Sequence, residues 1–331
     1  MIFTLDAMGG DFAPQAIVQG ALDAVGNSSE SLTLILLGDE TAIKQELGSE
    51  TPSSIKVIHT DEIVTMEDIG SKVLKTKPNS SLVRGINMVK DGEADGFISA
   101  GHTGAIMSAS LLTLGRIPGV RRPALAAYFP TEGRGKVLCD VGANPDAKPE
   151  HLVQFALMAS HYYHHVEGFS EPKFGLVNIG SEPNKGSELY VETYKLLSDM
   201  PNFVGNIEGR NLLTSNADVL ICDGFVGNTL LKFAESWINF FTDEIRDKIE
   251  EKVSYKLGAG LMKPVFDTLR SKYDYEEHGG TPLLGVNGVS VVCHGSSSHK
   301  SIMNSIFVAQ KCVKNRLIED TQKSLAIHFG N

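Results

Sequence analysis

Short apolar runs alternate with longer segments of helical periodicity along most of the chain. The runs are rich in aliphatic and β-branched residues and are bounded by glycine or aspartate, which is typical of buried strands. They span residues 2–5, 32–38, 55–60, 96–99, 124–129, 136–141, 174–180, 218–224 and 289–295. Apolar residues recur at helical spacing over residues 14–26, 79–91, 103–114, 149–166, 186–199, 226–250 and 298–317. This alternation predicts a three-layer α/β/α fold with a mostly parallel, Rossmann-like sheet.

The alternation continues without a linker. No stretch rich in serine, glycine or like charges divides the chain, and we see no internal repeat. We therefore expect residues 1–331 to form a single interleaved unit of one or two lobes. A hydrophobic content of 42% and a charged content of 21% are ordinary for a soluble globular protein.

The cysteines and the N-terminus predict a cytoplasmic protein. The four cysteines lie far apart, three of them in strand-like runs, so we expect reduced core residues rather than disulfides. The chain opens on a strand with no basic region before it, which argues against a signal peptide. No apolar run approaches the roughly 20 residues of a membrane span. The protein is therefore expected to be soluble or peripheral to a membrane.

The formal net charge of −10 argues against a general nucleic-acid-binding protein, which needs a basic face to neutralise phosphates. A small anionic substrate needs only a local positive site and remains compatible with this charge.

Six loops that follow strands are rich in glycine: DAMGGD, SAGHTGA, DVGANPD, NIGSEPNKG, CDGFVGN and CHGSSSH. In a parallel sheet, such loops emerge at the carboxyl edge, where open α/β sheets bind ligands. Glycine allows the backbone to approach a ligand, and a following helix N-terminus offers N–H groups to an anion. The six loops therefore predict one shared site for a phosphate-bearing or other anionic substrate. The alternative is that glycine and asparagine here serve only the turns.

Common catalytic motifs are missing. The chain has no G-x-G-x-x-G after a strand, P-loop, G-x-S-x-G or H-E-x-x-H motif. The run HYYHH at 161–165 lies in a helical pattern without a cysteine or carboxylate pattern beside it, so we interpret it as structural. Chemistry by positioning and electrostatics is favoured over chemistry by a metal or a covalent nucleophile.

Several long stretches together resemble one enzyme family. They are LDAMGGDFAP, KPNSSLVRGINMVKDGEADGFISAGHTGA, RRPALAAYFP, DVGANPD with HLVQFA, FGLVNIGSEPNKGSEL, FVGNIEGR, ADVLICDGFVGNTLLK, GGTPLLGVNG and HGSS. With these stretches, which run from the N-terminus to about residue 300, the chain resembles the bacterial phosphate acyltransferases of phospholipid synthesis. It departs from their pattern at His102, where asparagine is expected, and at YEEHGG, which places His278 before the glycines.

The resemblance implies a fold, a reaction and partners. The fold would be related to that of phosphotransacetylases and of isocitrate and isopropylmalate dehydrogenases. It would have no cofactor and would lack the metal-binding carboxylates and the nicotinamide site of the dehydrogenases. The reaction would move a long-chain acyl group from acyl-carrier protein to inorganic phosphate. The acyl phosphate would then pass to a membrane glycerol-3-phosphate acyltransferase.

This reaction needs a phosphate cradle, donors for the developing oxyanion and exclusion of water rather than a triad, because phosphate is an adequate nucleophile and a thiolate leaves readily. As candidate catalytic residues we take Lys185, Asn228, Lys232 and His294. The candidate substrate-binding residues are Asp6, Gly9, Gly10, Asp11, Ser99, Gly101, His102, Thr103, Gly104, Asp140, Asn144, Asn178, Gly180, Asp223, Gly227, Ser296 and Ser297. The aspartates would repel phosphate, so we expect them to position neighbours. Surface lysines, a helix cap at Asn228 and a turn histidine remain the plainer alternatives.

Two surfaces are candidates for partners. Arg116, Arg121 and Arg122 form the densest basic stretch and would suit an acidic carrier protein. A segment at about 238–273 is amphipathic and basic, and Gly258, Gly260 and Pro264 predict that its second part breaks into a helical hairpin. Its apolar residues would contact a membrane surface or a second subunit of a homodimer. They are Leu257, Leu261, Met262, Val265 and Phe266.

Three other functions stay open at this point. A coenzyme A-dependent phosphotransacetylase would share the fold and the need for phosphate. A non-catalytic anion-binding regulator would also use glycine-rich loops. A metal-dependent decarboxylating dehydrogenase is disfavoured because clustered carboxylates and a nucleotide fingerprint are missing.

Overall fold

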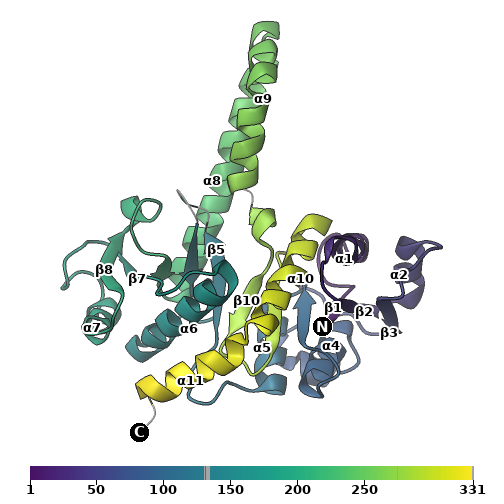
Figure 1. Ribbon diagram of the computed structural model, residues 1–331, viewed down its shortest axis with the longest axis horizontal. Coiled ribbons are helices and arrows are strands. Elements are labelled where there is room, and N and C mark those ends of the chain that lie inside the picture. Colours follow the sequence, from purple (N-terminus) through teal and green to yellow (C-terminus); the bar gives the residue numbers. More distant parts are fainter. Residues whose placement is uncertain (130, 132–134, 274, 330–331) are drawn as a thin grey trace.

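The computed structural model describes residues 1–129, 131, 135–273 and 275–329. Eleven strands form one continuous sheet in the order β3-β2-β1-β4-β11-β10-β5-β6-β9-β7-β8 (Figure 1). The strands are β1 (Ile2–Asp6), β2 (Thr33–Gly38), β3 (Ile55–His59), β4 (Gly96–Ser99), β5 (Ala124–Phe129), β6 (Lys136–Cys139), β7 (Phe174–Asn178), β8 (Phe203–Glu208), β9 (Val219–Ile221), β10 (Thr281–Leu284) and β11 (Val289–Val292).

Helices cover both faces of this sheet. They are α1 (Gln15–Asn27), α2 (Glu40–Leu47), α3 (Val73–Thr76), α4 (Ser81–Lys90), α5 (Thr103–Leu114), α6 (Pro149–Glu167), α7 (Glu188–Leu197), α8 (Gly224–Glu250), α9 (Val253–Tyr273), α10 (His299–Lys314) and α11 (Leu317–Phe329). Three short 3₁₀ helices are η1 (Gly70–Lys72), η2 (Gly209–Asn211) and η3 (Tyr275–His278). The predicted three-layer α/β/α class with a mostly parallel sheet is confirmed.

Side-chain alternation along the central strands builds two separate cores. In β4, Phe97 belongs to the core under α4 and α5, whereas Ile98 belongs to the core under α1, α6 and α10. In β6, Val137 and Leu138 divide in the same way. Successive side chains of a strand point to opposite faces, so a continuous apolar run is buried on both sides.

The strands change direction in the middle of the sheet. β10 is antiparallel to both β11 and β5, and β5 is antiparallel to β6. Consequently β6, β7, β8 and β9 run opposite to β1, β2, β3, β4 and β11, although each group is parallel within itself. The carboxyl ends of the two groups therefore lie at opposite edges of the sheet.

Several elements differ from the sequence prediction. The helical pattern at 298–317 is interrupted after Lys314, because Arg316 takes a left-handed backbone conformation (φ 56°) and a separate helix, α11, follows. The strands β8 and β10 were not predicted. β8 is an edge strand with Gly205 at φ 91°, and β10 is four residues long and includes Pro282, so neither has a strong strand pattern.

The helices α8 and α9 form a long hairpin that stands out from the body (Figure 1). The turn lies between Glu250 and Val253, so the predicted break of the second segment at Gly258, Gly260 and Pro264 is wrong. Both glycines have open space around their Cα atoms, and a helical glycine costs only about 1 kcal/mol, which the rest of the helix tolerates. Within the described part of the chain, no helix has the length and hydrophobicity to cross a membrane.

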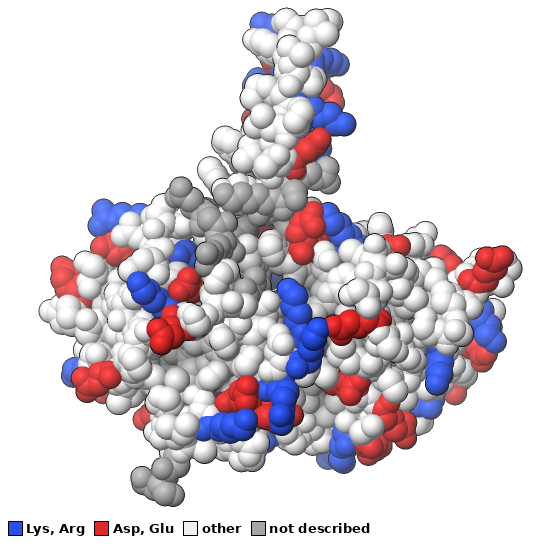
Figure 2. All heavy atoms as spheres, in the orientation of Figure 1, with Lys and Arg blue, Asp and Glu red and all other residues white. Residues whose placement is uncertain are grey.

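The hairpin presents large apolar side chains to solvent. Near its tip, Leu257 is 69% and Leu261 87% exposed, whereas Phe266 is half-buried. Closer to the body, α8 exposes an aromatic row formed by Phe233, Trp237, Phe240 and Phe241. Charged side chains gather mainly along one side of the hairpin in Figure 2, while both signs are mixed over the body on that face.

The histidines of the HYYHH run give the fold a dependence on pH. The rings of His161 and His165 on α6 are 6.2 Å apart, beside the contact with α11. Burial lowers the pKa of both rings, and the neighbouring histidines lower it further. Asp320, 3.5 Å from His165, opposes this shift. The folded state therefore prefers neutral rings.

We expect the free energy of unfolding to fall as the pH drops below the ordinary histidine pKa of about 6.5, because the unfolded state then binds more protons than the folded state. Thermal unfolding measured from pH 8 to pH 5 tests this. Replacing His161 by glutamine should reduce the loss of melting temperature on the acid side. Parallel curves for the native chain and His161→Gln would contradict the assignment to this ring.

Candidate active site

The loops after β1, β4 and β11 meet at one edge of the sheet around a buried carboxylate. Asp6, which is 3% exposed, accepts hydrogen bonds from the hydroxyls of Ser81 (2.5 Å) and Ser99 (2.8 Å). The hydroxyl of Ser99 in turn accepts a hydrogen bond from the Gly101 N–H (3.0 Å). Burial raises the pKa of Asp6, while these serine hydrogen bonds oppose the rise. Through its hydrogen bond with Ser99, Asp6 thus fixes the conformation of the 99–104 loop.

Two glycines allow these loops to touch. A Cβ atom on Gly9 would lie 2.8 Å from the Gly101 nitrogen, and one on Gly10 would lie 3.1 Å from the Gly295 carbonyl oxygen. Gly10 also has φ 106°, a conformation that favours glycine. The Asp11 N–H donates to the Gly295 carbonyl oxygen at 2.7 Å. We call residues 6–11, 99–104 and 294–297 the first cluster.

The first cluster presents polar groups at two helix N-termini. His102 is the N-cap of α5, and its Nδ1 accepts a hydrogen bond from the Ala105 N–H at 3.3 Å. Histidine thus caps the helix where asparagine was expected. Thr103 beside it is exposed.

The 294–297 loop precedes the second of these helices, α10. His294 is exposed and its Nδ1 lies 2.8 Å from the Ser296 hydroxyl. Ser297 is buried and accepts from the Ser301 hydroxyl at 3.2 Å, so it stabilises the turn rather than facing outward.

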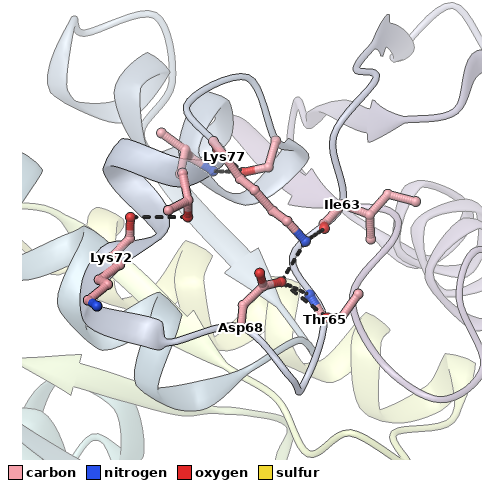
Figure 3. A network of polar contacts seen from close by, with 8 residues as sticks. Ile63, Thr65, Asp68, Lys72 and Lys77 are labelled. Carbon is pink, nitrogen blue, oxygen red and sulfur yellow. Dashed lines mark hydrogen bonds and ion pairs between the residues drawn. The ribbon is translucent and has the colours of Figure 1, made fainter.

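A segment missed by the sequence analysis closes one side of the first cluster. A Cβ atom on Gly70 would lie 2.7 Å from the backbone of Gly104, so η1 packs directly on the first turn of α5. The Lys77 ammonium fixes this segment, because it donates to the Ile63 carbonyl oxygen and to Asp68, each at 2.6 Å (Figure 3). Asp68 also accepts from the Thr65 N–H, and its hydrogen bond with Lys77 lowers its pKa.

The loops after β6 and β9 meet at the opposite edge, around Asp140. This buried carboxylate accepts hydrogen bonds from the backbone N–H groups of Leu125, Ala143 and Asn144, and from the Asn144 side chain. Burial raises its pKa, and the hydrogen bonds oppose the rise. Asn144 also donates to the Pro123 carbonyl oxygen (2.7 Å). The side chains of Asp140 and Asn144 therefore stabilise the 140–144 loop through these hydrogen bonds.

Asp223 caps α8. Its carboxylate accepts from the N–H groups of Phe225 and Val226 and from the Tyr190 hydroxyl at 2.6 Å. Burial, followed by this hydrogen bond, raises the pKa of Tyr190. A Cβ atom on Gly227 would collide with the carbonyl oxygen of Asp140, so this position requires glycine.

The candidates Asn228 and Lys232 follow on the first turns of α8. Asn228 lies beside Gly142, at 3.7 Å from an ideal Cβ position there, and is half-buried. Lys232 is exposed.

The loop after β7 presents Lys185 at this same edge. The Asn178 side chain donates to the Lys185 carbonyl oxygen (2.9 Å) and accepts from the Ile179 N–H (2.8 Å). Gly180 lies against the aliphatic part of Lys185. The Lys185 ammonium is 3.7 Å from Glu182, and the side chain is 46% exposed. We call residues 140–144, 178–186 and 223–228, together with Lys232, the second cluster.

The expectation that all six loops share one edge is therefore wrong. The first cluster contains Asp6, Ser99, His102 and His294, and the second contains Lys185 and Asn228, on strand groups that run in opposite directions. Sequence analysis also missed Ser81 and Tyr190, whose hydroxyls donate to the buried carboxylates of Asp6 and Asp223, respectively. No local pattern marks either residue, because each reaches its aspartate only through the tertiary fold.

The three arginines lie next to the second cluster. The Arg116 guanidinium donates to the Arg121 carbonyl oxygen at 2.6 Å, and the Arg121 N–H donates to Gln154 of α6 at 2.8 Å. Among the described residues, Arg116, Arg121 and Arg122 form no ion pair with a carboxylate. The charges of Arg122 and Arg121 contribute, after burial, to the lowered pKa of His151.

Solved structures of phosphotransacylases have a similar fold. A phosphotransacetylase from Streptococcus pyogenes superposes with a TM-score of 0.63 at 16% identity, covering 95% of this chain and 94% of that one. A branched-chain phosphotransacylase from Enterococcus faecalis V583 gives a TM-score of 0.60, also at 16% identity. At such identities the likeness establishes the fold and leaves the activity open.

Comparison with curated sequences establishes the family. A family model described as "Fatty acid synthesis protein" matches residues 1–320. A phosphate acyltransferase from Desulfitobacterium hafniense is 46% identical over 328 residues, which are 98% of each chain. Another from Pelotomaculum thermopropionicum is 44% identical and covers 98% of this chain and 95% of its own. The chain belongs to the phosphate acyltransferase family.

Proposed function

We propose that this protein transfers a long-chain acyl group from acyl-carrier protein to inorganic phosphate, giving acyl phosphate for phospholipid synthesis. The observation that carries the proposal is the match to phosphate acyltransferases over nearly the full length of both chains. The chain is an acyltransferase of this family, and the donor and the chain length are the proposed part.

The first cluster is our candidate for phosphate binding and acyl transfer. The N-termini of α5 and α10 both begin there, and helix N-termini stabilise anions. A phosphate oxygen would attack the thioester carbonyl carbon, the carbon–sulfur bond would break, and the leaving thiolate would take a proton. His294, oriented by Ser296, is the group we assign to that proton or to the developing oxyanion. Asp6 acts as a positioning residue beneath Ser99.

The second cluster contributes to this chemistry in a homodimer. Lys185, Asn228 and Lys232 emerge at the other edge of the sheet, so we infer that they complete the first cluster of a second copy. The aromatic row of α8 begins five residues beyond Asn228 and suits a second copy of the chain, because large exposed apolar patches mark interfaces. Arg121 and Arg122 lie beside this cluster and are our candidates for docking the acidic carrier protein.

The reaction itself tests the proposed donor and acceptor. Palmitoyl-carrier protein should disappear on a conformationally sensitive gel only when phosphate is present, and hydroxylamine should trap the product. In the same assay, Arg122→Glu should raise KM for palmitoyl-carrier protein and leave KM for palmitoyl-coenzyme A unchanged.

Three outcomes of this assay decide between functions. Phosphate-dependent consumption of the carrier-protein substrate supports the proposal. Consumption of palmitoyl-coenzyme A alone would show that the protein is a phosphotransacetylase. Consumption of neither by folded protein would leave an anion-binding regulator, recognised by a melting temperature that rises with phosphate.

We further propose that the tip of the hairpin binds the cytoplasmic face of the membrane. In the half of α9 nearer the turn, Leu257 is 69% and Leu261 87% exposed, and Met262 and Val265 follow at the middle of the helix, each half exposed. Lysines flank these residues, a combination that favours an anionic lipid surface. Such contact would place the insoluble product near a membrane glycerol-3-phosphate acyltransferase.

Leu261→Glu should abolish sedimentation with vesicles containing phosphatidylglycerol, because it places a carboxylate at the most exposed apolar position of the tip. Turnover in solution should stay within about two-fold, since Leu261 is remote from both clusters in the fold. The matched control is Leu196→Glu, at a 49% exposed leucine on α7 outside the hairpin. Equal vesicle binding by both variants would refute membrane contact through the tip.

A further inference from the structure

The short helix η3 is clamped onto the start of α10. The Glu276 carbonyl oxygen accepts from the Asn304 side chain at 2.9 Å, and Glu277 pairs with Lys300. Gly279 follows with φ 75°, and a Cβ atom there would lie 2.6 Å from the Asn304 backbone. The ring of His278 stacks on Tyr128 of β5, with centroids 3.3 Å apart, so His278 has a packing role. These contacts leave η3 little freedom to move against α10.

The Glu276 side chain reaches from this clamp to the end of the 294–297 loop. Its carboxylate accepts a hydrogen bond from the Ser298 N–H at 3.3 Å. Ser298 is the N-cap residue of α10, and it follows the loop directly. A carboxylate at this position also interacts favourably with the positive end of the helix dipole.

The opposite side of the same loop is held by the loop that follows β1. The Asp11 N–H donates to the Gly295 carbonyl oxygen at 2.7 Å, and Gly10 packs against that oxygen. Ser296 lies between these two attachments, and its hydroxyl hydrogen-bonds His294, which directly precedes Gly295. The orientation of this pair therefore depends on both attachments, one of which is Glu276.

We propose that Glu276 is a positioning residue that fixes the 294–298 loop and thereby orients His294. The assignment of a substrate to this loop rests on the proposed function, whereas the positioning itself is a property of the fold. Glu276 acts through the Ser298 backbone and is not a catalytic residue. Because η3 follows α9, this attachment also joins the base of the hairpin to the loop.

Three variants separate positioning from general stability. Glu276→Ala removes the acceptor of the Ser298 N–H, and Glu276→Gln keeps an acceptor without the charge. Glu277→Ala is the matched control, since it removes the adjacent ion pair between η3 and α10 but leaves the bond to Ser298 intact. Each is measured for kcat and KM with palmitoyl-carrier protein and phosphate, and for the ring-proton NMR signal of His294, assigned with His294→Gln.

Glu276→Ala should lower kcat about ten-fold, the loss expected for one charge-assisted hydrogen bond, with little change in KM for the carrier-protein substrate. Glu276→Gln should recover most of the loss, and Glu277→Ala should behave as the native chain. The His294 signal should shift in Glu276→Ala and not in Glu277→Ala. Identical His294 signals in both alanine variants would overturn the proposal. If the native chain shows no turnover, the proposed function fails and the NMR comparison still decides the positioning.

Discussion

The reversal of strand direction at β10 and β5 is the constraint on which the arrangement of the site depends. Because three successive pairs across β11, β10, β5 and β6 are antiparallel, the two parallel groups direct their carboxyl ends to opposite edges. Ligand-binding loops of α/β proteins follow the carboxyl ends of strands. A sheet built in this way therefore has two sets of such loops, and each set forms its own polar cluster.

Buried aspartates organise both clusters. Asp6 accepts from two serine hydroxyls, Asp140 accepts from three backbone N–H groups and one amide, and Asp223 accepts from the first turn of α8. A hydrogen bond to a charged group contributes about 1.5–3 kcal/mol, and leaving such a group unpaired in the interior costs more. These carboxylates thus hold the loops in place through their hydrogen bonds.

Much of the fold followed from the sequence because it depends on local pattern. Runs such as residues 96–99 are apolar on both faces, and Phe97 and Ile98 enter separate cores. The reversal could not be predicted, since β10 is four residues long with a proline and its pairing partner β5 is about 160 residues away in the chain. Family resemblance supplied the residues of the candidate site, while their division between two edges required the topology.

The hairpin is a second feature that the sequence did not predict correctly. Gly258, Gly260 and Pro264 predict a break, yet α9 continues through all three. Each glycine has open space around it and costs about 1 kcal/mol, the proline costs about 3 kcal/mol, and the rest of the 21-residue helix bears these costs. The glycines that matter most are instead those at which another backbone comes close, such as Gly9 and Gly227. Sequence alone does not distinguish a glycine that another backbone approaches closely from a glycine in open space.

Subunit complementation tests most directly whether the two clusters meet across a dimer. His294→Ala removes a residue of the first cluster and Lys185→Ala one of the second, so each variant alone should be inactive. Unfolding and refolding an equal mixture should restore about a quarter of native activity, because half of the dimers are mixed and each mixed dimer has one intact site of two. No recovery from a mixture shown to contain mixed dimers would contradict a site completed by the partner subunit.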